Sequence, residues 1–168
     1  MQKPNSLQGK VRHLVFVFTA LLVLAADQLS KIWIRSHLAL GESVPETGFF
    51  QLTHVPNTGA VFGLFQGQSS ALIAIALIDV IVLLLFVLFI YRRFPVLDNS
   101  LSRIALGLIL GGTVGNLIDR LRLGHVTDFI EVGIWPTFNI ADSAMVVGVF
   151  MFAYCLLRLT QAEKRQNG

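Results

Sequence analysis

The chain has 168 residues, enough for one compact domain or for four membrane spans with little chain left over. Hydrophobic residues make up 54% of it and charged residues only 14%, and the mean hydropathy is +0.70. A soluble domain carries about 25% charged residues, so the composition excludes a soluble globule and a disordered chain. The single cysteine, Cys155, leaves neither an internal disulfide framework nor a zinc cluster. The sequence predicts an integral membrane protein.

Four apolar runs predict four transmembrane helices, because a helix needs about 20 apolar residues to cross the hydrocarbon core. All belong to one integral membrane domain, 1–168, with helices over 14–34, 71–91, 104–119 and 140–157 and outer loops over 35–70 and 120–139. The first run also has the features of a cleavable signal peptide, since Lys3, Lys10 and Arg12 precede it.

Positive charges predict the orientation of these helices. Nine of the 13 Lys and Arg residues fall in the two tails and the middle loop, and four fall on the other side. Because Lys and Arg concentrate in cytoplasmic loops, both termini are predicted to be cytoplasmic. The formal charge of +3 is then a topology signal, and we expect no nucleic-acid partner. The nine are Lys3, Lys10, Arg12, Arg92, Arg93, Arg103, Arg158, Lys164 and Arg165.

The two outer loops contain strand-like stretches. Residues 49–55 are rich in aromatic and β-branched side chains, and residues 125–132 place apolar residues and Asp128 in alternation. These stretches predict a small sheet that rests on the outer leaflet. The predicted fold class is therefore an all-α membrane protein, with four transmembrane helices and a small extracytoplasmic β-sheet.

The first and third helices carry glycines and polar residues at regular spacings. Gly107, Gly111 and Gly115 lie four apart, a spacing that lets a second helix approach closely. Asp27 and Lys31 are also four apart, which fits either a simple ion pair or a contact with substrate. On the third helix, Asn116 and Asp119 share one face at the outer end, where Asp119 suits a structural or orienting anion.

Two further acids, Asp128 and Asp142, bound the second outer loop. Asp142 fits a helix cap, because Asn139 precedes it by three residues, and Asp128 fits an exposed strand residue. Yet both are expected at the same depth on the same side of the membrane, where ionisable groups are costly and indicate function. Two close carboxylates can share one proton, so that one activates water while the other protonates a carbonyl oxygen or a leaving amine. This is the arrangement of an aspartic protease.

Five motifs in this order closely resemble those of bacterial lipoprotein signal peptidases, also called signal peptidase II or prolipoprotein signal peptidases. They cover the chain from Asp27 to Ser143. The motifs are Asp27-Gln28-Leu29-Ser30-Lys31, Asn57-Thr58-Gly59-Ala60-Val61-Phe62, Gly111-Gly112-Thr113-Val114-Gly115-Asn116-Leu117-Ile118-Asp119-Arg120, Gly124-His125-Val126-Thr127-Asp128-Phe129 and Phe138-Asn139-Ile140-Ala141-Asp142-Ser143. Because Asp27 begins a family motif, the resemblance disfavours cleavage of the first helix as a signal peptide.

The resemblance implies a catalytic pair formed by Asp128 and Asp142, with no metal and no cofactor. It implies that the enzyme removes the signal peptide from prolipoproteins just before a diacylglyceryl-modified cysteine, at the outer face of the bacterial plasma (inner) membrane. Membrane lipid and the inhibitor globomycin are further expected partners, and we expect a monomer. Seven more positions match residues that bind substrate or support the acids: Asn57, Gly112, Asn116, Arg120, Asn139, Asp27 and Lys31.

Two other functions fit parts of the sequence. A proton-coupled carrier or channel subunit could use Asp79, Asp119 and Asp142 as a relay. However, a relay needs acids spread through the membrane, and nine of the ten acids lie outside the centres of the predicted spans. A membrane scaffold would explain the glycines but not the outer acids. Asp79 matches none of the five motifs.

Overall fold

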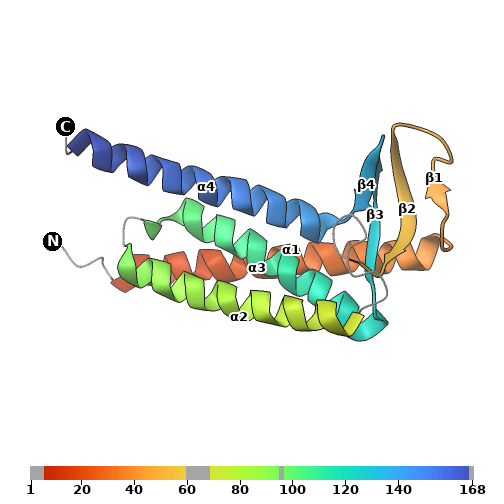
Figure 1. The fold of residues 1–168 in the computed structure, drawn as a ribbon, viewed down its shortest axis with the longest axis horizontal. Helices are drawn as coiled ribbons and strands as arrows, with labels where there is room; N and C mark the ends of the chain where they lie inside the picture. The colour runs from red at the N-terminus through yellow and green to blue at the C-terminus, as the bar shows by residue number, and fades with distance from the viewer. Residues whose placement is uncertain (1–5, 60–68, 95–96, 167–168) are drawn as a thin grey trace.

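The computed structural model describes residues 6–59, 69–94 and 97–166; part of the second motif, residues 60–62, lies outside these ranges, as does Lys3. Four long helices form a bundle, and a small sheet lies across one end of it (Figure 1). The first helix begins and the fourth ends at the opposite end of the bundle (Figure 1). The predicted fold class is confirmed. In chain order the elements are α1 (Ser6–His37), β1 (Ser43–Val44), β2 (Phe50–Asn57), α2 (Ser69–Arg93), α3 (Ser100–Leu123), β3 (Val126–Val132), β4 (Trp135–Phe138) and α4 (Ile140–Gln166).

Each helix is long and apolar enough to cross a membrane, and each extends beyond the run that hydropathy predicts. The extra turns lie where the sequence becomes polar, because helix ends are set by caps and not by hydrophobicity. In α3, the side chain of Asn99 accepts a hydrogen bond from the backbone N–H of Ser102, and Gly124 ends the helix with φ of 77°. Such a left-handed backbone favours glycine. The candidate spans are Val11–His37, Ser70–Ile90, Ser100–Leu123 and Ile140–Arg158.

Helix α3 lies at the centre of the bundle and packs against the other three helices. Its glycine stripe faces α1, as the sequence predicts: a Cβ on Gly111 would overlap Val23, and a Cβ on Gly115 would overlap Asp27. Close approach of the backbones therefore requires glycine at these positions. At the end of the bundle away from the sheet, Cys155 packs into an apolar cluster with residues of α2, α3 and α4, as expected for a small apolar group.

The sheet has four antiparallel strands in the order β1-β2-β3-β4. Both predicted strand regions are present as β2 and β3, which pair from Phe50 with Val132 to Asn57 with Val126. This register places Asn57 beside the strand that carries Asp128. Strand β4 leads directly into α4, so the sheet and the fourth helix meet next to Asp142.

Candidate active site

Asp128 and Asp142 line the same cavity, at the junction of the sheet and the bundle. Asp128 lies in the middle of β3 and is buried, whereas Asp142 lies in the first turn of α4. The cavity has a volume of about 940 Å³. Its lining residues are Asn57, Gly59, Asn116, Arg120, Val126, Asp128, Trp135, Pro136, Thr137, Phe138, Asp142, Ser143, Met145, Val146 and Val147.

Three asparagine side chains hold the two carboxylates. Asn57 and Asn139 each donate through Nδ2 to Asp128, at 2.8 Å to Oδ2 and 2.7 Å to Oδ1. Asn116 donates through Nδ2 to Oδ1 of Asp142 at 2.8 Å. All three donors are neutral amides, so none of these three hydrogen bonds brings a cation into contact with either carboxylate.

Asn139 links the two acids, and it also caps α4. Its backbone N–H donates to Oδ2 of Asp142 at 3.2 Å, and the backbone N–H of Asp142 donates to Oδ1 of Asn139 at 3.0 Å. This reciprocal pair is a capping box. The capping interpretation of Asp142 is therefore correct, and it coexists with the position of Asp142 in the cavity. The Nδ2 of Asn139 also donates to Oδ1 of Asn116 at 3.1 Å.

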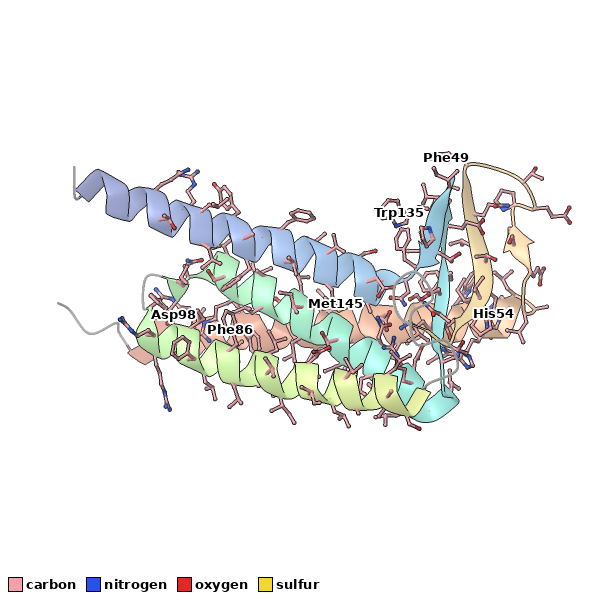
Figure 2. The ribbon with its side chains drawn as sticks, viewed as in Figure 1. Phe49, His54, Phe86, Asp98, Trp135 and Met145 are labelled. Atoms are coloured by element: carbon pink, nitrogen blue, oxygen red, sulfur yellow. The ribbon has the colours of Figure 1, made fainter. Side chains whose placement is uncertain are left out.

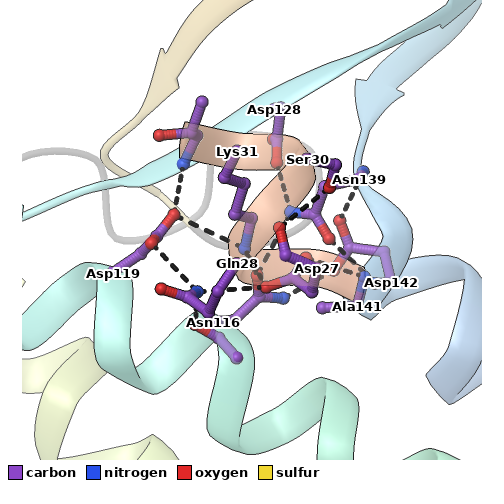
Figure 3. Close-up of polar contacts among 12 residues, drawn as sticks. Asp27, Gln28, Ser30, Lys31, Asn116, Asp119, Asp128, Asn139, Ala141 and Asp142 are labelled. Carbon is purple, nitrogen blue, oxygen red and sulfur yellow. Dashed lines mark hydrogen bonds and ion pairs between the residues drawn. The ribbon is translucent and has the colours of Figure 1, made fainter. Parts of the chain in front are cut away.

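A buried cluster of charged side chains lies behind Asn116, and Figure 3 shows it together with Asn116 and Asn139. Lys31 is fully buried, and its Nζ lies 2.8 Å from Oδ2 of Asp27 and 3.4 Å from Oδ2 of Asp119. The same Nζ donates to Oδ1 of Asn116 at 2.8 Å. Asp27 and Lys31 thus form the ion pair that their spacing predicts. Neither lines the cavity, and the contact of Lys31 with Asn116 places the pair behind that wall residue.

The acids of this cluster also hold the backbone next to each cavity acid. Oδ1 of Asp27 accepts a hydrogen bond from the backbone N–H of Ala141 at 3.1 Å. Oδ2 of Asp119 accepts one from the backbone N–H of Thr127 at 3.0 Å. Because these two N–H groups precede Asp142 and Asp128 directly, one buried network fixes the positions of both carboxylates.

Arg120 and Gly112 occupy different places. Arg120 lines the cavity, and its Nη2 lies 3.5 Å from the carbonyl oxygen of Gly59. Its Nε is buried and has no hydrogen-bond partner among the residues that the structure describes. Gly112 instead lies at the crossing of α3 and α4, where a Cβ would overlap the carbonyl oxygen of Ala141 and the side chain of Met145. It therefore supports the position of α4.

Two further residues, Gln28 and Arg35, belong to this network, although the sequence predicted no role in the site for either of them. Gln28 donates to the carbonyl oxygen of Gly115 at 3.1 Å and to Asp119 at 3.3 Å. Arg35 donates to the hydroxyl of Thr127 at 2.8 Å and lies 3.7 Å from Asp119. For Arg35 the available signal was the four-residue spacing on one face of α1 that also places Asp27 and Lys31 together. By contrast, Asp79 lies on an exposed face of α2 and does not line the cavity.

Burial first, and then the negative charge of Asp142, raise the pKa of Asp128 from 3.8 to about 6, against the hydrogen bonds from Asn57 and Asn139 that lower it. A carboxyl group in this range can hold a proton near neutral pH, as general acid–base catalysis requires. Across the part of the chain that the structure describes, no three His, Cys, Asp or Glu side chains gather as a metal-binding group.

This pKa predicts how stability depends on pH. Between pH 4 and pH 6 the folded protein holds a proton on Asp128 that the unfolded chain has lost, so stability falls as pH rises through this window. The shift from 3.8 to about 6 corresponds to roughly 3 kcal/mol. We measure thermal unfolding of both proteins and expect the Tm of the wild type, relative to that of Asp128→Asn, to decrease as the pH rises from 4 to 8. Parallel Tm curves for the two proteins would contradict the raised pKa.

Together, four membrane-spanning helices and a carboxylate pair in one cavity, with Asp128 buried and Asp142 half-buried, define a membrane protein with an acid–base site. Comparison with known proteins identifies its family. The sequence profile described as Signal peptidase (SPase) II matches residues 19–158. The chain therefore belongs to the signal peptidase II family, and it is a multi-pass membrane peptidase.

Relatives and solved structures agree with this assignment. The chain is 56% identical over 138 residues to a lipoprotein signal peptidase of Dehalococcoides mccartyi, covering 82% of this chain and 86% of the relative. It is 47% identical to a lipoprotein signal peptidase of Moorella thermoacetica over 84% of this chain and 92% of that one. A solved bacterial membrane enzyme superposes with a TM-score of 0.74 at 31% identity, covering 86% of this chain and 88% of the other.

Proposed function

We propose that this protein is an aspartyl endopeptidase that removes the signal peptide from diacylglyceryl-modified prolipoproteins, cutting just before the lipid-modified cysteine. The observation that carries the proposal is the joint position of Asp128 and Asp142 in one cavity, with Asn139 bonded to both. Membership of the signal peptidase II family supports the same reaction class.

The geometry supports a reaction in which the two acids share a single proton. The ionised acid takes a proton from a water molecule as the water attacks the scissile carbonyl carbon. The protonated acid donates to the carbonyl oxygen, and a proton then passes to the leaving amine as the C–N bond breaks. Asn57, Asn116 and Asn139 keep the carboxylates in place throughout, because their Nδ2 donors are neutral and do not titrate.

Arg120 is the cavity residue best suited to bind the substrate backbone. Its guanidinium lines the cavity and retains a buried Nε without a partner among the described residues, so it can donate to a peptide carbonyl. Apolar side chains form much of the remaining wall, among them Trp135, Phe138 and Met145. Such a wall suits the lipid and the apolar residues that flank the scissile bond.

The proposal also includes how the enzyme is oriented in the membrane and on which face the cavity lies. The excess of Lys and Arg at the end of the bundle away from the sheet favours cytoplasmic termini, and it supports a cavity at the outer face of the bacterial plasma membrane. A bond beside a membrane-embedded diacylglyceryl group can reach this depth without the lipid entering water. We propose that the enzyme acts as a monomer and that globomycin competes with substrate for the cavity.

Purified protein in detergent should cut a prolipoprotein that carries diacylglyceryl-cysteine and release a lipoprotein with that cysteine at its amino terminus. The same precursor with an unmodified cysteine is the matched control. Three or more buried methylene groups, at about 0.8 kcal/mol each, should favour the lipidated substrate in kcat/KM by at least about 50-fold. Mass spectrometry of the products locates the cut. Equal rates for the two substrates, or a cut elsewhere, would rule out the proposed specificity.

A further inference from the structure

The free end of the sheet carries an exposed apolar surface, and of its residues only Trp135 also lines the cavity. Four side chains form it, and we name them the sheet tip: Phe49, Phe50, Ile134 and Trp135. Their exposed fractions are 77%, 54%, 104% and 65%, respectively. Large exposed apolar patches on a protein mark a surface that contacts another apolar phase.

Backbone contacts join the two segments of the sheet tip. The N–H of Gly133 donates to the carbonyl oxygen of Phe49 at 2.7 Å, and Phe50 pairs with Val132 across the sheet. The turn between β3 and β4 is thereby fixed to the start of β2. Figure 2 shows Phe49 and Trp135 at this free end of the sheet, on the side of α4.

Charge and position identify what the sheet tip contacts. No charged residue occurs in 47–52 or in 132–138, which together contain the tip. Strand β4 runs directly into α4, so Ile134 lies within about 20 Å of the beginning of a membrane span at about 3.3 Å per strand residue. Tryptophan at such a boundary typically lies at the level of the lipid headgroups.

We propose that the sheet tip inserts into the leaflet of the membrane at the sheet end of the bundle, beside α4. Its occupant is the lipid of the same bilayer that the four helices span. The cavity lies between the sheet and α4, since β4 supplies Trp135 and Phe138 to its wall and α4 supplies Met145 and Val146. Inserted in this way, the tip keeps the mouth of the cavity within the leaflet, so that an acyl chain enters it sideways without crossing water.

Fluorescence of Trp135 tests the insertion without reference to cleavage, so the result is independent of the proposed function. The chain has two tryptophans, and Trp33→Phe leaves Trp135 as the single emitter. This variant is placed in vesicles of phosphatidylethanolamine and phosphatidylglycerol, with and without lipid brominated near the top of the acyl chain. We expect a blue-shifted emission that brominated lipid quenches strongly and aqueous iodide quenches weakly.

Strong quenching by iodide with none by brominated lipid would place the tip in water and overturn the proposal. Shielding from both quenchers would show a protein surface over the tip and would also overturn it.

Two aspartate substitutions in the Trp33→Phe protein provide the matched comparison. Ile134 is fully exposed, so Ile134→Asp leaves the packing of the fold unchanged while adding charge to the tip. Leu40→Asp adds the same charge at an exposed residue in the turn between α1 and β1, next to the edge strand farthest from β4 (Figure 1). We expect Ile134→Asp to reduce quenching by brominated lipid and Leu40→Asp to leave it unchanged. Equal quenching in both variants would contradict insertion of the tip.

Discussion

Asp128→Asn and Asp142→Asn are each expected to abolish cleavage of a diacylglyceryl-modified prolipoprotein while the protein remains folded. An asparagine side chain cannot accept a proton from water or hold the shared one, and general acid–base catalysis contributes about 10²- to 10⁴-fold in rate. Asparagine at 142 can still cap α4 through its side-chain oxygen, because Asn139 donates its backbone N–H to that position. Rates are measured on purified protein in detergent, with thermal unfolding as the check on folding.

Asp79→Asn is the matched control for these variants. It makes the same change at a carboxylate on the exposed face of α2, outside the cavity. We expect it to retain the wild-type rate, which separates loss of the catalytic pair from loss of any one negative charge. A folded Asp128→Asn or Asp142→Asn protein with wild-type turnover would remove that acid from the mechanism.

Lys31→Met is expected to produce the largest loss of stability among single changes in the charge cluster. It removes the cation that lies 2.8 Å from Asp27 and 3.4 Å from Asp119, and leaves two buried carboxylates poorly compensated. Breaking a buried ion pair in this way typically costs about 3–5 kcal/mol. Denaturant or thermal unfolding in detergent measures the loss, and Arg92→Met, which removes an exposed cation, should have little effect.

A second substitution distinguishes charge compensation from lost packing. Asp27→Asn in the Lys31→Met protein removes one of the two uncompensated charges, yet its side-chain oxygen can still accept the N–H of Ala141. We therefore expect the double variant to recover part of the lost Tm. A double variant less stable than Lys31→Met alone would show that the Asp27 carboxylate stabilises the fold even without its cation, and would contradict charge compensation as the cause of the loss.

Hydropathy predicted the four helices because each span is a nearly continuous apolar run, and alternation predicted β2 and β3. Hydropathy did not predict where the helices end, because the ends depend on local caps such as Asn99 and Gly124. Strand β4 was also missed. It is only four residues long and contains Pro136, a residue that argues against a strand unless the strand is at an edge. It is in fact one of the two edge strands of the sheet.

The two cavity acids could be singled out because carboxylates at membrane depth are costly and both bound one loop. The network behind them could not be derived from spacing. Lys31 meets Asn116 across 85 positions of sequence, and Asn57 meets Asp128 across 71. Such contacts depend on how closely α1 approaches the glycine stripe of α3 and on the register of β2 with β3. The sequence resemblance named these residues as site or supporting residues, but only the packing separates Lys31, behind the cavity, from Asn57, within it.

The central claim is that Asp128 and Asp142 act as one unit on one peptide bond, and a double-variant comparison tests it most directly. Cleavage rates of the diacylglyceryl substrate are measured for the wild type, Asp128→Asn, Asp142→Asn and the protein carrying both changes. Residues that act as a unit are strongly non-additive, so all three variants should fall to the same background rate. Losses that instead multiply, with the double variant slower than either single variant by the other's full factor, would contradict a shared-proton pair.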